Sequence, residues 1–276
     1  MVSNVARPAG IVLSFAFLIF LAGCSGPGGE GQKGGKHTVT IAGSTSVMPF
    51  TEKLAEHFMV DHPQFAVDVQ GGGSTAGIQA CMNGTVNIGM SSRLLKDDEL
   101  SLTQIVICYD GISIIVHPDN PLKALSLEQA RNIFAGRIRN WKELGWIDRN
   151  IDGVTREEGS GTRGSFEDMV MKDSEIGSGI MVQDSNGSVR EVVATDPYAI
   201  GYISLGLVDK RVRTVAVDGI VPSVAAIKRK EYRIVRPFLY LVNGERGKDT
   251  GTFIDWVLSR DGQKVLKNEG LIGVND

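Results

Sequence analysis

The 276-residue sequence predicts an α/β fold, because predicted strands repeatedly run into loops of glycine and hydroxyl residues. Three such loops occupy residues 43–46, 71–75 and 91–93, and a helical pattern follows directly after the first two. A fourth loop, at residues 159–163, lies between a strand and a helix in the second half of the chain. This repeated design predicts two α/β lobes that carry polar residues at their strand ends.

The first half, after residue 36, opens with alternating apolar and polar residues, which is typical of a strand. The spacing of Phe50, Leu54 and Phe58 then places apolar side chains on one face of a helix. On these criteria we expect, in order, strand 37–42, helix 48–60, strand 66–70, helix 78–82 and strands 87–90, 104–108 and 111–117.

The second half alternates in the same way. Its expected strands lie at residues 151–156, 199–203, 212–217 and 236–242. We expect helices at residues 127–134, 141–144, 165–171, 252–258 and 261–267, and another at 189–195 with Ser188 as its N-cap. We expect the C-terminal part of the chain to return to the first lobe. The chain would then cross between the lobes more than once, near residues 111–115 and 233–239.

The N-terminus predicts export. Arg7 precedes an apolar run over residues 11–22, which is too short to favour a membrane-spanning helix and ends in small residues. The segment Leu-Ala-Gly-Cys that ends at Cys24 resembles the lipobox of bacterial lipoproteins, which implies a signal peptide over residues 1–23 and a lipid on Cys24. The alternatives are an ordinary signal peptide and an uncleaved anchor. Residues 24–36, rich in glycine, predict a flexible tether.

Composition excludes several classes of function. With 42% apolar and 22% charged residues the chain is a typical globular protein, and its net charge of -3 argues against a nucleic-acid partner. Cys81 and Cys108 form either a disulfide or two buried thiols. Because no pattern of Cys or His has the spacing of metal ligands, we expect neither a metal site nor a cofactor.

The glycine and hydroxyl loops are suited to binding an anion. Glycine lets the backbone approach a ligand, the first N–H groups of a helix lack internal partners, and serine and threonine add O–H donors. A single loop of this kind is equally well explained as an ordinary helix cap. Four such loops in one chain indicate an anion site.

Arg156 and Arg163 flank the fourth of these loops, and a guanidinium matches two oxygens of an oxyanion. Glu158 is placed to orient Arg156 by an ion pair. The alternative is a solvated surface cluster of charges.

Enzymatic signatures are weak. Residues 159–164 fit the G-x-G-x-x-G pattern, but they lie mid-chain without repeated mononucleotide-binding units, and residues 26–31 fit the pattern equally well. The sequence carries neither a P-loop nor a G-x-S-x-G elbow. The adjacent carboxylates of Glu157 and Glu158 would point to opposite faces of a strand, which suits a catalytic pair poorly. We therefore expect a binding protein and not an enzyme.

Motifs along nearly the whole chain, from about residue 38 onward, resemble the phosphate-binding proteins of bacterial ABC phosphate importers, the PstS family. They include AGSTS at residues 42–46, QGGGS at 70–74, NIGMSSR at 87–93 and REEGSGTR at 156–163. Further matches are YDGI at 109–112, AIGYI at 199–203, RPFLY at 236–240 and SRDGQ at 259–263. The stretch at 156–163 is the most specific of them.

The resemblance implies a type II periplasmic-binding-protein fold with a hinge and an interlobe ligand cleft. It predicts lobe 1 over residues 37–113 and 237–276 and lobe 2 over residues 114–236. By this resemblance the chain is a monomeric lipoprotein on the extracytoplasmic face of the membrane. It would capture inorganic phosphate and deliver it to the permease of an importer driven by an ATPase.

Carried over position by position, the phosphate contacts fall on Thr45, Ser46, Ser74, Ser92, Arg156, Ser160, Gly161 and Thr162, with Arg93 as a weaker candidate. Some family members carry an aspartate where this sequence has Ser92, and that carboxylate accepts the proton of hydrogen phosphate. In this chain either Asp110 or Glu158 serves as the acceptor, or the discrimination against sulfate is weaker. Binding of another oxyanion, such as sulfate or molybdate, and a role in sensing or adhesion are the remaining alternatives.

Overall fold

The computed structural model describes residues 36–276, which form one compact unit. The predicted signal peptide (1–23), the lipid site at Cys24 and all of the predicted tether except Lys36 lie outside the described residues. Within the described part, no helix is both long and apolar enough to cross a membrane.

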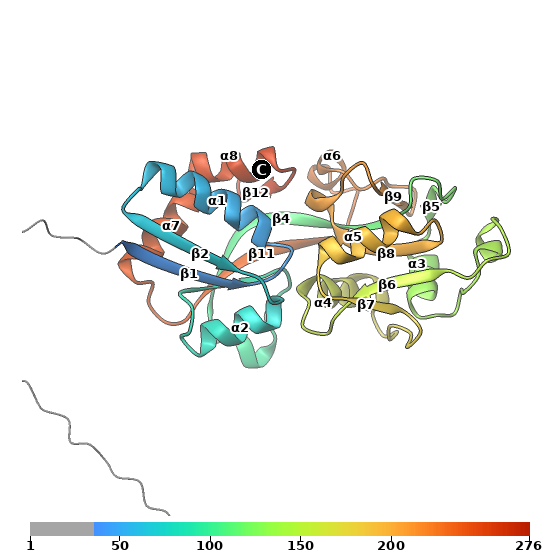
Figure 1. Cartoon of the computed structure of the whole chain (residues 1–276), viewed down its shortest axis with the longest axis horizontal. Coiled ribbons are helices and arrows are strands. Elements are labelled where there is room, and N and C mark those ends of the chain that lie inside the picture. The colour runs from blue at the N-terminus through green and yellow to red at the C-terminus, as the bar shows by residue number, and fades with distance from the viewer. Residues whose placement is uncertain (1–35) are drawn as a thin grey trace, which may run out of the picture. The chain divides into compact units, whose positions relative to one another are not determined.

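A ten-stranded mixed sheet runs through the described residues (Figure 1). Its main path follows the order β2 (Phe65–Gln70), β1 (His37–Gly43), β3 (Ile88–Ser91), β11 (Val235–Val242), β4 (Thr103–Val116), β8 (Ala199–Ser204), β6 (Asp152–Arg156) and β7 (Met181–Gln183). The short strands β9 (Arg213–Thr214) and β12 (Ile272–Gly273) pair with β4. A separate pair is formed by β5 (Ala124–Leu125) and β10 (Ala216–Val217). These strands and helices confirm the predicted α/β class.

Helices alternate with these strands and lie at both ends of the sheet (Figure 1). The α-helices are α1 (Met48–Asp61), α2 (Ser74–Met82), α3 (Leu127–Phe134), α4 (Gly161–Phe166), α5 (Asn186–Thr195), α6 (Val224–Lys228), α7 (Lys248–Leu258) and α8 (Arg260–Asn268). Shorter helical turns are η1 (Asp97–Glu99), η2 (Trp141–Leu144), η3 (Glu167–Met171) and η4 (Leu205–Leu207). The π-helical η3 continues α4 without a break.

Two hydrophobic cores lie at the two ends of the sheet. Phe58 packs edge-on against Phe253 in the first core, between α1 and α7. In the second core Phe166 and Tyr202 stack with ring centroids 3.8 Å apart, and Phe134 meets both rings edge-on. The first core therefore combines the N-terminal and C-terminal segments, whereas the second is built mainly from the segments between them. These two parts are the two halves of the molecule.

Strands β4 and β11 pass from one core to the other (Figure 1). Along β4, Cys108 packs in the first core and Ile112 in the second; along β11, Phe238 packs in the first and Ile234 just before the strand packs in the second. The first part of β4 pairs with β11 and the second part pairs with β8.

The expectation of two separate strands at 104–108 and 111–117 was wrong, because β4 is one strand of 14 residues. Tyr109 and Asp110, which separate the two expected strands, lie inside β4. Asp110 stays within the strand because Arg236, its register partner on β11, neutralises it. The predicted strand 212–217 is conversely divided into β9 and β10, with Val215 between them.

Three helices that border glycine and hydroxyl loops begin earlier than expected, at Ser74, Gly161 and Asn186. The hydroxyl of Ser160 accepts hydrogen bonds from the N–H groups at positions 162 and 163, each at 3.2 Å, and thereby starts α4. Ser185, and not Ser188, caps α5, and its hydroxyl accepts the N–H of Ser188 at 3.0 Å. The loop residues are thus the first turns of these helices.

Both cysteines of the described chain are free thiols, which resolves the alternative left open by the sequence. The Cys81 thiol donates to the carbonyl oxygen of Leu241 at 3.2 Å. Burial raises the pKa of both thiols, so both stay protonated near neutral pH.

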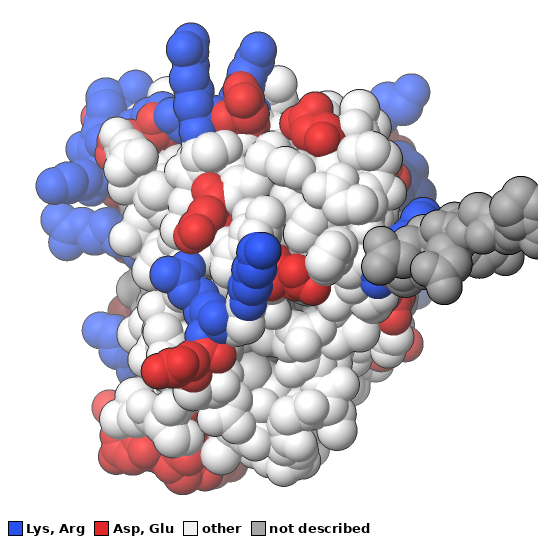
Figure 2. All heavy atoms as spheres, turned by 90° about the vertical axis from the view of Figure 1, so that its left-hand side faces the viewer, with Lys and Arg blue, Asp and Glu red and all other residues white. Residues whose placement is uncertain are grey.

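Charged side chains of both signs are scattered over the end of the unit shown in Figure 2, with uncharged surface between them. A basic face of the kind that binds nucleic acid does not cover this end of the described chain.

Gly77 allows α2 to lie directly on the end of β1. A Cβ at this position would lie 2.5 Å from the carbonyl oxygen of Ala42 and 2.5 Å from Cα of Gly43. We therefore expect Gly77→Ala to lower the free energy of unfolding by about 1–3 kcal/mol, as overpacking does, measured by urea denaturation. Gly251→Ala on α7 is the matched control, since a Cβ there meets nothing within 4 Å. Equal stability of the two variants would contradict the packing argument.

Candidate functional site

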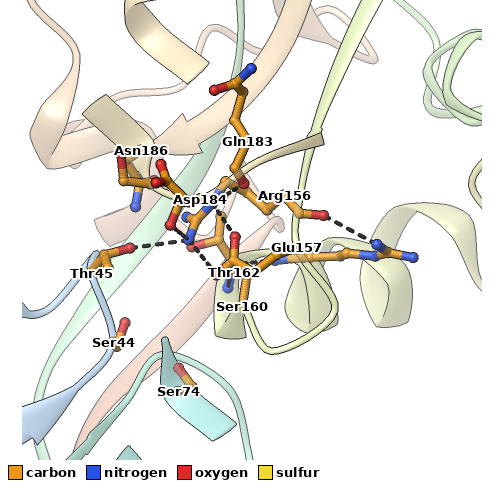
Figure 3. Close-up of polar contacts among 12 residues, drawn as sticks. Ser44, Thr45, Ser74, Arg156, Glu157, Ser160, Thr162, Gln183, Asp184 and Asn186 are labelled. Carbon is orange, nitrogen blue, oxygen red and sulfur yellow. Dashed lines mark hydrogen bonds and ion pairs between the residues drawn. The ribbon is translucent and has the colours of Figure 1, made fainter. Parts of the chain in front are cut away.

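The hydroxyl loops of both halves of the chain converge at one place (Figure 3). The loop after β1 and the start of α2 face the loop between β6 and α4, and the start of α5 lies beside them. A backbone hydrogen bond joins the two halves there, from the N–H of Thr75 to the carbonyl oxygen of Gly159 at 3.1 Å. The strand-end loops predicted from the sequence are therefore neighbours in space.

A pair of hydroxyls spans the two halves. Oγ of Ser46 and Oγ1 of Thr162 are 2.6 Å apart, and both side chains are buried. The amide nitrogen Nδ2 of Asn186 donates to Oγ of Ser46 at 2.9 Å. The hydroxyl of Ser46 therefore lies between partners on α4 and α5, and like any hydroxyl it can still donate one hydrogen bond.

A cluster of three buried serines lies next to this pair. Ser44 donates its hydroxyl to Oγ of Ser92 at 2.8 Å, and Oγ of Ser74 lies 3.4 Å from the same oxygen. The backbone N–H of Ser92 donates to Oγ of Ser74 at 3.1 Å. Each of these side chains is at most 1% exposed, so the cluster offers donors and acceptors out of contact with bulk water.

Arg156 enters the site from the end of β6 and is only 1% exposed. Its Nη2 donates to Oγ1 of Thr45 at 3.1 Å and to the carbonyl oxygen of Asp184 at 3.0 Å, and its Nε donates to the carbonyl oxygen of Gln183 at 3.2 Å (Figure 3). Its Nη1 has no hydrogen-bond partner among residues 36–276. A buried N–H group without a partner is costly, which makes this nitrogen a candidate donor to a ligand.

Glu157, and not Glu158, is the carboxylate that orients Arg156. Its two oxygens accept from Nε and Nη2 at 3.0 and 2.9 Å. Glu158 is exposed, which also argues against it as an acceptor inside the site. The expected pairing with Glu158 is therefore wrong: β6 ends at Arg156, and the loop that follows turns Glu157 towards the guanidinium. Arg163 instead holds α4 in place, through Glu167 and the carbonyl oxygen of Arg156.

Gly161 brings backbone against the serine cluster. A Cβ here would lie 2.2 Å from Oγ of Ser74 and 2.6 Å from Oγ of Ser92. A side chain at this position would therefore fill the space between the two halves.

Arg93 lies beside the site, but its guanidinium forms a bidentate ion pair with Glu99. Nη1 and Nη2 of Arg93 donate to the two carboxylate oxygens at 2.7 and 2.8 Å, and Nη2 also donates to Thr75 at 3.3 Å. The hydrogen bond from Arg93 holds the pKa of Glu99 below its ordinary value. This pair anchors the segment that leads from β3 to η1.

Asp110 is fully engaged by protein partners. Its Oδ1 accepts from the Ser204 hydroxyl at 2.9 Å, and its Oδ2 accepts from Nη2 and Nε of Arg236 at 3.1 and 3.3 Å. Burial raises the pKa of Asp110 even though Arg236 opposes that shift. No cluster of His, Cys, Asp or Glu within residues 36–276 has a geometry that would hold a metal ion.

Two residues of the site escaped the sequence prediction, Ser44 and Asn186. Ser44 lies within the AGSTS motif, but the family resemblance places no phosphate contact on it. Asn186 was hidden because the helix there was expected to begin at residue 189. The preceding Ser185, a good N-cap residue, is the signal that could have revealed it.

Several known proteins that are similar to this chain are named as phosphate-binding proteins. A sequence profile of the PBP superfamily domain matches residues 28–261. The phosphate-binding protein PstS of Bacillus subtilis (strain 168) is 32% identical over 284 residues, which cover 96% of this chain and 93% of that protein. The protein of the same name from Borreliella burgdorferi is 28% identical over 250 residues, with coverage of 86% and 90%.

Solved structures of phosphate transport proteins are also similar to this chain. A phosphate ABC transporter substrate-binding protein from Clostridium perfringens, with bound phosphate, superposes with a TM-score of 0.84 at 41% identity and covers 86% of this chain and 100% of its own. An ABC-type phosphate transport receptor from Vibrio cholerae superposes with a TM-score of 0.72 at 37% identity, with coverage of 85% and 99%.

The pair of Arg93 and Glu99 generates a test of folding stability. Glu99→Gln leaves a buried guanidinium without its charge partner, so we expect a loss of about 3–5 kcal/mol in the free energy of unfolding at neutral pH. Because the folded-state pKa of Glu99 is lowered, the stabilisation exists above its ordinary value and disappears as the pH falls.

Urea denaturation from about pH 7 to about pH 3 should therefore show the gap between wild type and Glu99→Gln closing as the pH is lowered. Glu231→Gln, which disrupts an exposed pair with Arg229, is the control and should behave as wild type. A gap that is constant with pH would rule out the charge pair as its cause.

Proposed function

The chain belongs to the PstS family of phosphate-binding proteins, and from this premise we propose how it holds and delivers its ligand. It is the substrate-binding protein of an ABC importer for inorganic phosphate; it is not an enzyme, and it acts outside the cytoplasm. Its fold is the type II periplasmic-binding-protein fold. We further propose the bounds of the two lobes, the phosphate contacts, the lipid on Cys24 and the delivery to the permease.

The single observation that carries the proposed contacts is the buried Nη1 of Arg156, which lacks a protein partner among the described residues. It belongs to a guanidinium that Glu157 and three protein oxygens already hold in place. A phosphate oxygen next to Nη1 would complete its hydrogen bonding. Buried hydroxyls around this position can take the remaining oxygens, with backbone N–H groups beside them.

The proposed contacts come from both lobes. Lobe 1, residues 37–113 and 237–276, would supply Thr45, Ser46, Ser74 and Ser92. Lobe 2, residues 114–236, would supply Arg156, Ser160, Gly161 and Thr162. We assign Arg93 a supporting role, because Glu99 uses its guanidinium. Phosphate would bind to one lobe first, and closure about β4 and β11 would bring the donors of the other lobe onto it.

Selectivity in this site rests on hydroxyl groups. The carboxylates of Glu157 and Asp110 are each held by an arginine, and Ser92 is surrounded by other serines. A serine hydroxyl can accept the proton of hydrogen phosphate, but it can equally donate to an oxygen that has no proton. We therefore propose that sulfate is rejected less strongly here than by a site that presents a free carboxylate.

Arg156→Ala tests the proposed contact. The loss of a charge-assisted hydrogen bond should weaken phosphate binding by about 1.5–3 kcal/mol, or roughly 10- to 150-fold in Kd, measured by isothermal titration calorimetry on the mature protein. Arg131→Ala is the control, because Arg131 donates to the carbonyl oxygen of Val170 away from the site. An unchanged affinity of Arg156→Ala would remove that residue from the site. A wild type that shows neither heat nor a shift in stability with phosphate would refute phosphate binding itself. Sulfate titrated under the same conditions measures the selectivity.

Delivery would take place at the membrane. We propose that a lipid on Cys24 anchors the mature chain beside its permease, which an ATPase drives, and that one copy suffices because a single chain supplies both sets of donors. A single lipid signal binds a membrane only marginally, so contact with the permease would strengthen the attachment.

Cys24→Ser tests the anchor. Without the thiol no lipid can be attached, so the variant should lose metabolic labelling by radioactive palmitate and leave the membrane fraction on sedimentation. Cys81→Ser is the control, since its thiol is buried within the fold. Retention of label by Cys24→Ser would contradict the proposal.

A further inference from the structure

Asn186 is a buried residue that reaches towards the site from the first turn of α5, and both ends of its amide are used. Its Nδ2 donates to Oγ of Ser46 at 2.9 Å, and its Oδ1 accepts the backbone N–H of Ser204 at 3.1 Å. The side chain is only 1% exposed. The position of the Ser46 hydroxyl is therefore tied to the end of β8.

The connection continues beyond Ser204. Its hydroxyl donates to Asp110 on β4 at 2.9 Å, and Asp110 accepts from Arg236 on β11. Nη1 of Arg236 donates to the backbone carbonyl oxygen of Ser92 at 3.3 Å, which also accepts from the Ser165 hydroxyl at 3.0 Å. A continuous chain of buried hydrogen bonds thus runs from one proposed phosphate contact to another, and its members are Ser46, Asn186, Ser204, Asp110, Arg236 and Ser92.

The centre of this hydrogen-bond chain lies where the two halves of the protein are joined. Asp110 and Arg236 are register partners on β4 and β11, at the place where both strands pass from one hydrophobic core to the other. Each is at most 2% exposed. A buried ion pair tolerates little change in geometry, because a separated charge in the interior is costly. Bending of the two strands here would therefore disturb the hydrogen bonds at both ends of the chain.

We propose that this buried chain couples the phosphate contacts to the strands that join the lobes, with Asn186, Ser204 and the Asp110–Arg236 pair acting as positioning residues. The proposal rests on the proposed function, because it concerns the same site. When the lobes close, the chain fixes the hydroxyl of Ser46 and the backbone of Ser92 in their binding positions. A break in the chain lets the closed form reopen more readily and so accelerates the release of phosphate.

Ser204→Ala is the critical variant, because Ser204 makes no hydrogen bond to any proposed phosphate contact within the described structure. We expect roughly a tenfold weaker phosphate affinity, mainly through faster dissociation, the size expected from leaving one buried acceptor unsatisfied. Asn186→Ala should have an effect of similar size. Both substitutions break the same hydrogen-bond chain. The double variant should therefore lose much less phosphate affinity than the product of the two single effects.

Asn120→Ala is the matched control. Asn120 is a buried asparagine in the same half of the molecule as Asn186. It donates to the carbonyl oxygen of Pro197 at 3.0 Å and is not a member of the hydrogen-bond chain. It should lower the melting temperature without changing the dissociation rate, measured by stopped-flow fluorescence. Ser204→Cys, which keeps the volume but weakens the donor, serves as a second variant should Ser204→Ala fail to fold, and a melting curve without phosphate checks folding.

The outcomes are distinct. A wild type that binds phosphate, together with folded Ser204 variants whose Kd and dissociation rate stay within twofold of wild type, would overturn this inference alone. Effects of Asn186→Ala and Ser204→Ala that multiply independently would overturn it as well. A wild type that binds no phosphate would refute the proposed function, and this inference with it.

Discussion

The burial of Arg156 is the constraint on which the rest of the site depends. A guanidinium that is 1% exposed must have its N–H groups satisfied, and the surrounding chain satisfies all but Nη1. Glu157 and the carbonyl oxygens of Gln183 and Asp184 fix the plane of the group, while Thr45 contacts it from the loop after β1. The donor that remains is therefore rigid before a ligand arrives, so little conformational entropy is lost when it binds an oxygen.

Charge balance explains why neutral donors matter so much here. The buried arginines of the described chain are each matched by one carboxylate, in the pairs Arg156–Glu157, Arg93–Glu99 and Arg236–Asp110. The protein therefore offers the anion almost no net formal charge. In the proposed site, serine and threonine hydroxyls and backbone N–H groups would replace the water around a phosphate dianion. Gly161 keeps these groups close together, because its missing side chain leaves room for the serines opposite.

Local chemistry was predictable from the sequence, and distant partners were not. Helix α3 begins and ends where expected, because Ser126 caps it and its apolar residues keep helical spacing. Helices α2, α4 and α5 begin earlier than expected because glycine and serine, which usually indicate loops, form their first turns. The continuity of β4 depends on Arg236, which lies 126 residues from Asp110, and a sequence pattern cannot supply such a contact. The expected pairing of Glu158 with Arg156 was wrong, because Glu157 binds the guanidinium and the sequence does not show how the loop after β6 places the two carboxylates.

A crystal structure of the mature protein grown with phosphate near neutral pH tests the central claim most directly. A phosphate oxygen should lie within hydrogen-bond distance of Nη1 of Arg156, with the hydroxyls of Ser46, Ser92 and Thr162 around the same ion. A phosphate bound elsewhere, or one in this site that leaves Nη1 of Arg156 without a contact, would contradict the account.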